Sequence, residues 1–337
     1  MAEARPTIKD IARVTGVSVA TVSRALRGLP HVAPATRGRV MEAAESLDYA
    51  AHPQASSLVS GRTWTVGVVA PHFGTWFPFR AMGGINSVFA RAGYDMLISV
   101  MTSAEDRRSL LEDAGALCRR VDGILLIDTF VSVEADSAGA FFDRPVVAVG
   151  EQLAGAASIS IDNRGAARRA VEHLIELGHE RIGLVTGASC PPDLAMPVPQ
   201  MRRLGYCDAL EAAGLPVARE LEVAGSWTAA GGAAALARLL ERPDPPTAVF
   251  SMSDEMAFGV LKEAARRGLA VPRDLSVVGF DDHDLAETLG LTTMRQAVSE
   301  MGVEAAETVI SLIEGLEAVD IVWDVPLMVR ETTAAAP

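Results

Sequence analysis

The chain has 337 residues, of which 49% are hydrophobic, and its net charge is −13. This length allows two or three domains with sizeable apolar cores, and the hydrophobic fraction excludes a disordered chain. The 3 cysteines exclude a disulfide-stabilised scaffold. No run of about 18 apolar residues is present, which excludes a spanning helix. The first residues, MAEARPTIKD, lack the apolar stretch of a secretory signal peptide, so we expect a cytoplasmic protein.

Charge is distributed unevenly along the chain. Residues 1–62 contain 8 basic and 5 acidic residues, a net charge of +3, whereas the remaining residues carry −16. A small basic segment on a large acidic body is typical of a protein in which only that segment contacts a polyanion. The alternative is an ordinary solvated charged surface.

The basic segment begins with the pattern of a short, capped helix. Thr7 and Asp10 resemble a capping box, and apolar residues at helical spacing follow them. Gly16 suits the left-handed conformation that ends a helix. Ser18 is expected to cap a second helix over residues 19–26, because serine oxygens accept hydrogen bonds from N-terminal amides.

The second predicted helix has one apolar and one mixed face. It would bury Val22 and Leu26. The opposite face carries Val19, Ala20, Ser23 and Arg24. A third helix would begin near Pro34, with an inward stripe at Val40, Ala43, Ala44 and Leu47. This pattern favours a helix-turn-helix whose second helix fits the major groove of DNA, and the alternative is a helical hairpin without a nucleic-acid role.

The stretches TIKDIARVTGVSVATVSRAL and VAPATRGRVMEAAESLDY resemble the DNA-binding headpiece of the lactose-repressor (LacI/GalR) family, nearly without gaps over residues 7–63. The resemblance implies that Val19, Ala20 and Arg24 read bases, and a guanidinium suits bidentate bonding to guanine. It also implies phosphate-side or capping roles, which fix register on the DNA. The residues concerned are Thr7, Ser18, Thr21, Ser23, His31 and Thr36.

Residues 52–63, HPQASSLVSGRT, have the composition of a linker. In the resembled family this segment forms a short helix on operator DNA, and a leucine from each subunit enters the minor groove. Leu58 occupies that position, with Ala55 one turn earlier. Ser56 and Val59 stand where basic residues are frequent in the family, which predicts fewer phosphate contacts and weaker affinity. The alternative is that Leu58 is an ordinary apolar linker residue.

From Thr65 onward, short apolar runs alternate with helical stretches. Strands are expected at 66–70, 95–100, 123–127, 145–149, 182–186, 220–224, 248–251 and 276–279. Helices are expected at 81–92, 106–120, 165–177, 201–213, 229–240 and 255–267. This alternation predicts parallel sheets with right-handed crossovers. Because the region is too long for one such sheet, we expect two α/β lobes with a ligand-binding cleft between them.

The family resemblance continues through this region. It is carried by VDGILLID, ISIDNRGAARRAVEHLIELGHERIGLVTG, RRLGYCDALEAAGLP, SMSDEMAFGVLKEAARRGLAVPRDLSVVGFDD and LTTMRQ. It implies an α + α/β protein with a two-lobed core similar to periplasmic sugar-binding proteins. The implied domains are a helix-turn-helix headpiece at 1–50, a hinge helix or linker at 51–63, and an effector-binding and dimerisation core at 64–337.

The resemblance also implies where an effector binds. Asp162, Arg202 and Asp254 match positions that hold the effector in many members. Their chemistry suits a polyol, because carboxylates accept hydroxyl hydrogens and a guanidinium donates in a fork. Trp227 matches a position that often supplies an aromatic wall. Phe280 and Asp281 lie at the end of an expected strand, where a cleft residue belongs.

An aromatic cluster follows the first expected strand, in the segment PHFGTWFPFR at 71–80. We interpret it as a loop that lines the cleft, and the alternative is packing within the first lobe. The candidate cleft residues are Phe73, Trp76 and Phe77.

Motifs for catalysis are absent from the sequence. It has no G-x-G-x-x-G after the first strand, no P-loop and no G-x-S-x-G, and His173 and His179 lack zincin spacing. We therefore expect no catalytic residues, cofactor or metal. The chain ends soon after MVRETT, so we expect no tetramer-forming tail.

Together these features predict a homodimeric DNA-binding transcriptional regulator, most simply a repressor, with a pseudo-palindromic operator. Its operator affinity would be changed by a small molecule, with a sugar as the leading candidate. Two alternatives stay open. One is a sugar-binding protein without a DNA role, and the other is a regulator that responds to a purine or nucleoside.

Overall fold

The computed structural model describes residues 6–26, 32–47, 62–71, 74–101, 103–128, 142–187 and 197–337. The chain separates into two compact units, Met1–Thr63 and Trp64–Pro337. Each unit has hydrophobic cores of its own.

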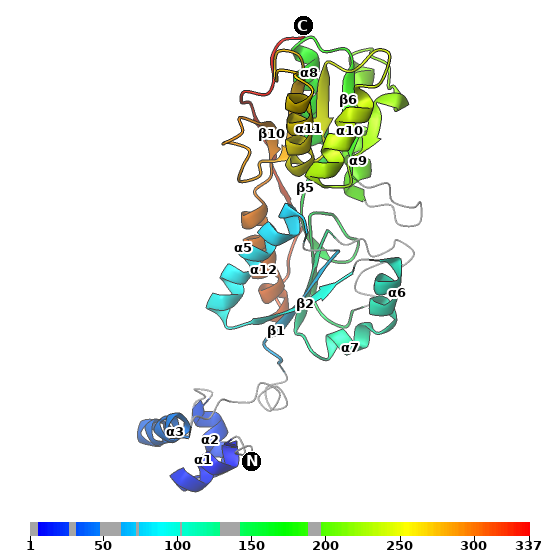
Figure 1. The fold of residues 1–337 in the computed structure, drawn as a ribbon. Coiled ribbons are helices and arrows are strands. Elements are labelled where there is room, and N and C mark those ends of the chain that lie inside the picture. The colour runs from blue at the N-terminus through cyan, green and yellow to red at the C-terminus, as the bar shows by residue number, and fades with distance from the viewer. Residues whose placement is uncertain are drawn as a thin grey trace. The chain divides into compact units, whose positions relative to one another are not determined.

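The first unit contains the three expected helices (Figure 1). They are α1 (Ile8–Thr15), α2 (Val19–Leu26) and α3 (Pro34–Ser46). Their shared core consists of Ile11, Val22, Ala25, Val40, Ala43 and Ala44. Ala25 takes the buried place on α2 that was expected for Leu26, which is only half-buried at the end of the helix.

Local hydrogen bonds explain where α1 and α2 begin. The backbone N–H and the hydroxyl of Thr7 donate to Oδ2 of Asp10 at 2.9 and 2.7 Å, which fixes the first turn of α1. Gly16 ends that helix with φ of 71°. Oγ of Ser18 accepts the N–H of Thr21 at 3.1 Å and so caps α2. The predicted caps are confirmed.

The second unit contains two six-stranded sheets, one in each lobe (Figure 1). The N-terminal lobe has the strand order β11-β5-β4-β3-β1-β2, and the C-terminal lobe has the order β12-β10-β9-β8-β6-β7. The strands of the first sheet are β1 (Thr65–Ala70), β2 (Asp95–Val100), β3 (Gly123–Ile127), β4 (Val146–Val149), β5 (Ala157–Ile161) and β11 (Ile321–Trp323). Those of the second are β6 (Ile182–Thr186), β7 (Glu222–Ala224), β8 (Ala248–Ser251), β9 (Ser276–Asp281), β10 (Thr292–Arg295) and β12 (Leu327–Met328). The described pairings are parallel except for β10 with β12.

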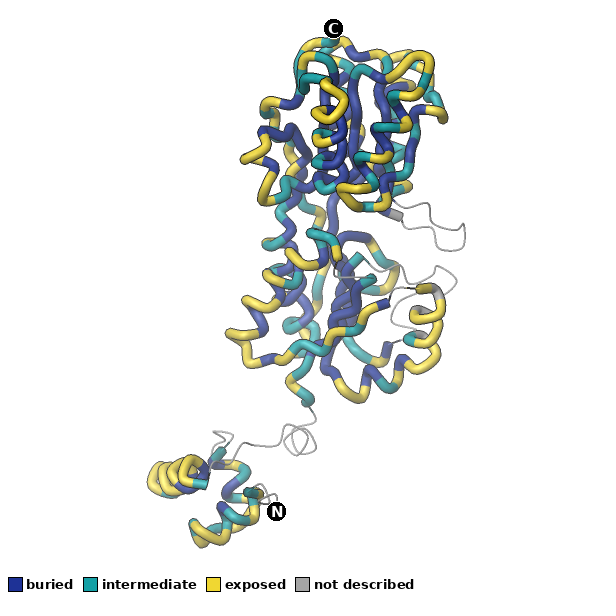
Figure 2. Tube along the Cα trace, viewed as in Figure 1, coloured by how far each residue is buried: buried dark blue, intermediate teal, exposed yellow. Residues whose placement is uncertain are grey.

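Helices pack in pairs against these sheets. The N-terminal lobe contains α5 (Trp76–Ala92), α6 (Ala104–Glu112), α7 (Ala114–Cys118) and α12 (Val298–Ile313). The C-terminal lobe contains α8 (Asn163–Glu176), α9 (Pro197–Ala212), α10 (Ala229–Leu239) and α11 (Asp254–Arg266), with a short 3₁₀ helix at Arg219–Leu221. The main pairs are α5 with α12, α8 with α9, and α10 with α11. Figure 2 shows that the strands are largely buried while the helices expose their outer faces.

The structure corrects several sequence-based boundaries. Helix α5 begins at Trp76 rather than at 81, because Thr75 has the extended conformation of a helix cap. Trp76 and Phe77 therefore lie in the first helical turn and not in a loop. The expected helix at 106–120 is divided into α6 and α7 at Asp113, which has non-helical φ and ψ. Strands β5, β10, β11 and β12 and helix α12 were not predicted.

Three described segments connect the two lobes. Asp162 joins β5 to α8, residues 296–297 join β10 to α12, and residues 324–326 join β11 to β12. The N-terminal lobe therefore needs α12 and β11 from late in the chain. Because parallel strands end at a common edge, the residues after β3, β4, β8 and β9 are available to line the cleft between the lobes.

Candidate nucleic-acid interface and interlobe cavity

The exposed face of α2 combines small apolar side chains with one cation. Val19, Ala20 and Arg24 are exposed on this face, while Val22 and Ala25 hold the opposite face in the core. Arg24 forms no hydrogen bond or ion pair with any part of the chain that the structure describes. Its guanidinium can therefore reach an external partner without breaking a hydrogen bond or ion pair to the described residues.

The other candidate DNA-contacting residues that the structure describes differ in how far they are exposed. Thr7 and Ser18 are exposed at the starts of α1 and α2, and Thr21, Ser23 and Thr36 are half-buried. Thr7 and Ser18 are already engaged in capping contacts within the chain. The remaining candidates, His31, Ala55 and Leu58, lie outside the described residues, as does Phe73.

A cavity lies between the lobes of the second unit, and we call it the interlobe cavity. The N-terminal lobe contributes Thr75, Phe77, Asp128 and Gly150. The C-terminal lobe contributes Val198, Arg202, Trp227, Ser253, Glu255 and Asp281. Gln296, in one of the connecting segments, completes the lining. The mixture of aromatic walls, carboxyls and one guanidinium suits a small polar ligand with an apolar face.

Arg202 is the buried cation of the interlobe cavity. Its Nε donates to Oδ1 of Asn163 at 2.9 Å, and another guanidinium nitrogen donates to the carbonyl of Met252. The guanidinium carbon lies 3.6 Å from the centre of the Phe280 ring. Burial lowers the pKa of Arg202, whereas the nearby carboxyls, Asp281 foremost, raise it. These contacts fix the orientation of the guanidinium toward the cavity before any ligand arrives.

Asp281 provides a buried acceptor beside Arg202. Its Oδ1 accepts a hydrogen bond from Nε2 of Gln296 at 2.7 Å, across the junction between C-terminal lobe and connecting segment. Burial raises the pKa of Asp281 well above its ordinary value, and the Arg202 charge acts in the opposite direction. Asp281 and Gln296 therefore form a polar pair that a bound hydroxyl could extend.

Backbone strain concentrates at this cavity. Asp128, Trp227 and Asp281 have φ values of 49°, 57° and 132°, in a region that L-residues rarely adopt. All three line the cavity. Such conformations cost on the order of 1–3 kcal/mol each and persist where the surrounding structure enforces them, which happens most often at functional sites.

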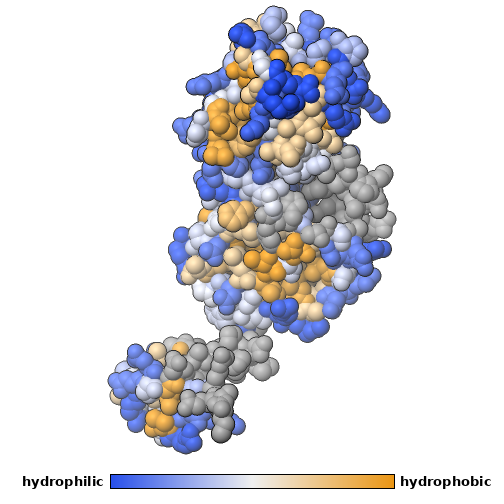
Figure 3. All heavy atoms as spheres, in the orientation of Figure 1, coloured by the Kyte–Doolittle hydropathy of each residue, from blue (hydrophilic) through white to orange (hydrophobic). Residues whose placement is uncertain are grey.

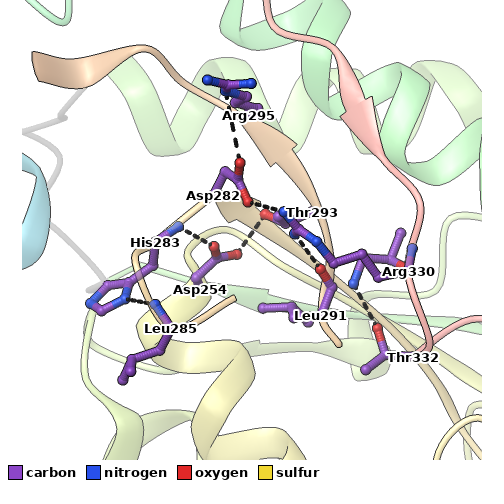
Figure 4. Close-up of polar contacts among 10 residues, drawn as sticks. Asp254, Asp282, His283, Leu285, Leu291, Thr293, Arg295, Arg330 and Thr332 are labelled. Atoms are coloured by element: carbon purple, nitrogen blue, oxygen red, sulfur yellow. Dashed lines mark hydrogen bonds and ion pairs between the residues drawn. The ribbon is translucent and has the colours of Figure 1, made fainter. Parts of the chain in front are cut away.

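Asp254 occupies a different environment from the one its sequence position suggested. It is fully buried and does not line the interlobe cavity. Its carboxylate accepts the hydroxyl of Thr293 at 2.6 Å and the backbone N–H of His283 at 2.8 Å (Figure 4). Burial raises its pKa to about 6, and these hydrogen bonds oppose the shift. Asp254 thus ties the segment after β9 to β10 and α11.

Residues 7–52 match the profile of the bacterial regulatory proteins of the lacI family, and residues 171–333 match that of the periplasmic binding protein-like domain. The HTH-type transcriptional repressor CytR of Escherichia coli K12 is 34% identical over 344 residues, which cover 99% of this chain and 98% of CytR. The chain belongs to the LacI family.

Solved structures agree with this assignment. The lac repressor dimer bound to operator and the anti-inducer ONPF superposes with a TM-score of 0.84 at 26% identity, covering 98% of this chain and 100% of that one. The CelR–cellobiose complex gives a TM-score of 0.67 at 32% identity, with 97% and 100% covered. The predicted family and the predicted architecture, a helix-turn-helix headpiece with a two-lobed core, are confirmed. This LacI-family protein is a transcriptional regulator of the helix-turn-helix type.

Four of the predicted effector residues of this LacI-family protein meet in the interlobe cavity. They are Phe77, Arg202, Trp227 and Asp281. Phe280 is fully buried beneath Arg202. Trp76 instead joins the lobes, since its backbone N–H donates to Glu255 and its indole Nε1 donates to Asp284, both at 3.3 Å.

Asp162 lies outside the interlobe cavity. Its Oδ1 accepts the N–H of Gly165 at 2.8 Å and caps α8. It lines a neighbouring cavity that shares Gly150 and Val198 with the interlobe cavity.

Seven lining residues were not predicted. They are Thr75, Asp128, Gly150, Val198, Ser253, Glu255 and Gln296. A positional signal could have identified some of them, because Asp128 and Gln296 directly follow strands β3 and β10, and Ser253 caps α11. In the part of the chain that the structure describes, no helix is long and apolar enough to cross a bilayer, and no group of acidic, histidine or cysteine side chains is arranged to hold a metal.

Proposed function

We propose that this protein is a repressor that binds a pseudo-palindromic DNA operator as a homodimer and changes its operator affinity when a small carbohydrate enters the interlobe cavity. The observation that carries the proposal is that one chain combines an exposed recognition face on α2 with a polar cavity between two lobes. CytR is named a transcriptional repressor, and the lac repressor dimer has been solved on its operator.

In the proposed complex, residues 1–50 form the DNA-binding headpiece. Arg24 forms bidentate hydrogen bonds with a guanine, and Val19 and Ala20 contact base edges through apolar atoms such as a thymine methyl. Backbone phosphates are held near the helix starts, which sets the register. The proposed phosphate-side residues are Thr7, Ser18, Thr21, Ser23, His31 and Thr36. Residues 51–63 form the hinge, where Ala55 and Leu58 face the minor groove.

Residues 64–337 form the proposed effector-binding and dimerisation core. Arg202 donates to ligand hydroxyls and Asp281 accepts from them, while Phe77 and Trp227 cover an apolar sugar face. Asp254 supports the loop that carries Asp281, and we assign Asp162, Trp76 and Phe280 to the surroundings of the site. Phe73 stays a proposed effector contact. The CelR structure contains cellobiose, which supports a carbohydrate as the ligand class.

A purine or nucleoside is the second candidate effector, because the rings of Phe77 and Trp227 could also stack on a base. A sugar-binding protein without a DNA role would leave the exposed face of α2 without a purpose. We propose no catalytic role and a cytoplasmic location, where a regulator meets the chromosome.

The three connecting segments provide a route from effector to DNA. A ligand that contacts both lobes stabilises one lobe arrangement relative to another, and a tenfold preference shifts that equilibrium by about 1.4 kcal/mol. The contacts of Trp76 with Glu255 and Asp284 form or break as the lobes change their separation. The proposed result is a change in the spacing of the two hinges in the dimer.

Exposed apolar side chains support the proposed homodimer. Figure 3 shows apolar atoms gathered on the face of the N-terminal lobe that carries β2. Ile98 and Val100 on this edge strand are 45% and 44% exposed. Leu285 and Leu289, after β9, are 50% and 47% exposed. Apolar patches of this kind mark interaction surfaces, and we propose that a second subunit covers these.

Electrophoretic mobility shifts with genomic fragments at low salt test the proposal. We expect one or a few fragments to shift, and a panel of carbohydrates and nucleosides to change that shift. Arg24→Ala should abolish the preference for those fragments. Arg13→Ala, which removes an exposed arginine from α1, is the matched control and should retain it. If no fragment shifts, or if Arg24→Ala keeps full selectivity, the proposal is wrong.

A further inference from the structure

The charges that line the interlobe cavity are unbalanced. Three carboxyls face it, Asp128 from the N-terminal lobe and Glu255 and Asp281 from the C-terminal lobe. Within the described lining, Arg202 is the one cationic side chain.

Neighbouring carboxyls already offset the positive charge of Arg202. The carboxyls of Asp281, Asp128 and Asp254 all act on its charge, so three acids surround one base. Two of its nitrogens donate to Asn163 and Met252 within the protein. An anionic ligand would therefore enter a field that is already negative, and buried charges are only weakly screened by salt.

A neutral polyol meets the same surroundings in the opposite way. Each ligand hydroxyl carries a hydrogen that a carboxylate can accept, and its oxygen can accept from Arg202. Such hydrogen bonds join carboxyls from the two lobes without adding charge. A carboxylate or phosphate on the ligand would offer only acceptors to Asp128 and Glu255.

We infer that the interlobe cavity selects an uncharged polyhydroxylated ligand and rejects sugar acids and sugar phosphates, with Asp128 and Glu255 as the residues that determine this selectivity. The inference rests on the proposed function, which assigns the cavity to an effector, and it adds the charge class of that effector.

The positions of Asp128 and Glu255 suit this role. Asp128 directly follows β3 and is held at φ of 49°. Gly150 packs beside it, since a Cβ there would lie 3.4 Å from Oδ1 of Asp128 and a tight 3.1 Å from the Phe77 ring. Glu255 lies in the first turn of α11, where the helix dipole favours a negative charge, and accepts the backbone N–H of Trp76 at 3.3 Å from the other lobe. Each carboxyl is thus fixed at the junction of the lobes.

The test uses matched pairs of ligands that differ in charge. Isothermal titration calorimetry compares glucose with glucuronate, galactose with galacturonate, ribose with ribose 5-phosphate, and cellobiose with cellobionate. We expect at least one neutral member to bind, and its anionic partner to bind at least 100-fold more weakly. Tighter or equal binding of an anionic member would overturn the inference while leaving a carbohydrate effector in place.

Two substitutions identify the residues responsible. Asp128→Asn and Glu255→Gln should each reduce the neutral-to-anionic affinity ratio at least tenfold. Glu241→Gln removes a carboxylate from an exposed position of the same lobe as Glu255 and should leave the ratio unchanged. An unchanged ratio in both cavity variants, or an equal reduction in the Glu241 control, would overturn the inference. If no member binds a protein that still shifts operator DNA, both the inference and the carbohydrate proposal fail, while the DNA-binding proposal stands.

Discussion

Glu151 should make the core of this protein less stable at neutral pH than at mildly acidic pH. It follows β4, is 7% exposed, and its Oε1 is buried without a hydrogen-bond partner among the described residues. Burial, with a smaller contribution from Asp128, raises the pKa of Glu151 to about 8 from its ordinary value of 4.5. The substitution that tests this is Glu151→Gln, which keeps the shape and removes the titration.

The expected magnitude follows from proton linkage. Between pH 4.5 and about 8 the folded state holds a proton that the unfolded state has released, so the free energy of unfolding falls as pH rises through this window. At about 1.4 kcal/mol per pH unit, the whole window corresponds to about 5 kcal/mol. About 3 kcal/mol of this falls between pH 5 and pH 7.5. The Glu151→Gln variant should therefore gain about 3 kcal/mol relative to wild type over that interval.

Urea unfolding followed by tryptophan fluorescence measures this difference. The 4 tryptophans, at positions 64, 76, 227 and 323, all belong to the second unit, so the signal reports on the core and not on the headpiece. Glu241→Gln, at an exposed position, supplies the background pH dependence of a surface carboxylate. If the wild-type and Glu151→Gln curves stay parallel from pH 5 to 7.5, Glu151 titrates like a surface group and the reasoning is refuted.

Three further predictions concern other parts of the molecule. Ile11→Ala opens a cavity in the headpiece core, and should lower headpiece stability by about 2–5 kcal/mol and weaken operator binding. Tryptophan-detected unfolding should not change, and a parallel loss of core stability would show that the two units do not unfold independently. Arg202→Lys removes the planar fork that stacks on Phe280, so carbohydrate affinity measured by calorimetry should fall at least tenfold while operator DNA still binds. Retained carbohydrate affinity would contradict the assigned role of Arg202. Val100→Asp places a charge on the exposed edge strand β2, and light scattering should show monomers at micromolar concentration. An unchanged dimer mass would mean that subunits associate elsewhere.

The parts of the fold that were predictable have strong local signals. Thr7, Gly16 and Ser18 define the ends of α1 and α2 through side-chain caps and a left-handed glycine, and these depend on few residues. Strands β11 and β12 have three and two residues, too few for a periodic pattern, and exist because β5 and β10 pair with them. Helix α12 did carry a signal, since Val298, Met301, Ala305 and Val309 recur at helical spacing and are buried.

The candidate site shows a second limit of prediction from sequence. The family resemblance named Arg202 as a candidate effector residue, the end of an expected strand named Asp281, and both line the interlobe cavity. The resemblance gave Asp254 the same role as Arg202, although the carboxylate of Asp254 already accepts hydrogen bonds from Thr293 and His283, which are 39 and 29 residues away in the chain. Sequence states which side chain can accept a hydrogen bond. It does not state which donors the fold has already brought to that side chain.

The crossing of the chain between lobes has a consequence for biosynthesis. Among the described residues, the core shared by α1, α2 and α3 lies within residues 8–47, so it can form once that segment has left the ribosome. The N-terminal lobe has to wait for α12 and β11, so its sheet edge and the partner face of α5 stay uncovered until residue 323 has been made. In a nascent chain of this protein, the helix-turn-helix can therefore fold long before the interlobe cavity exists.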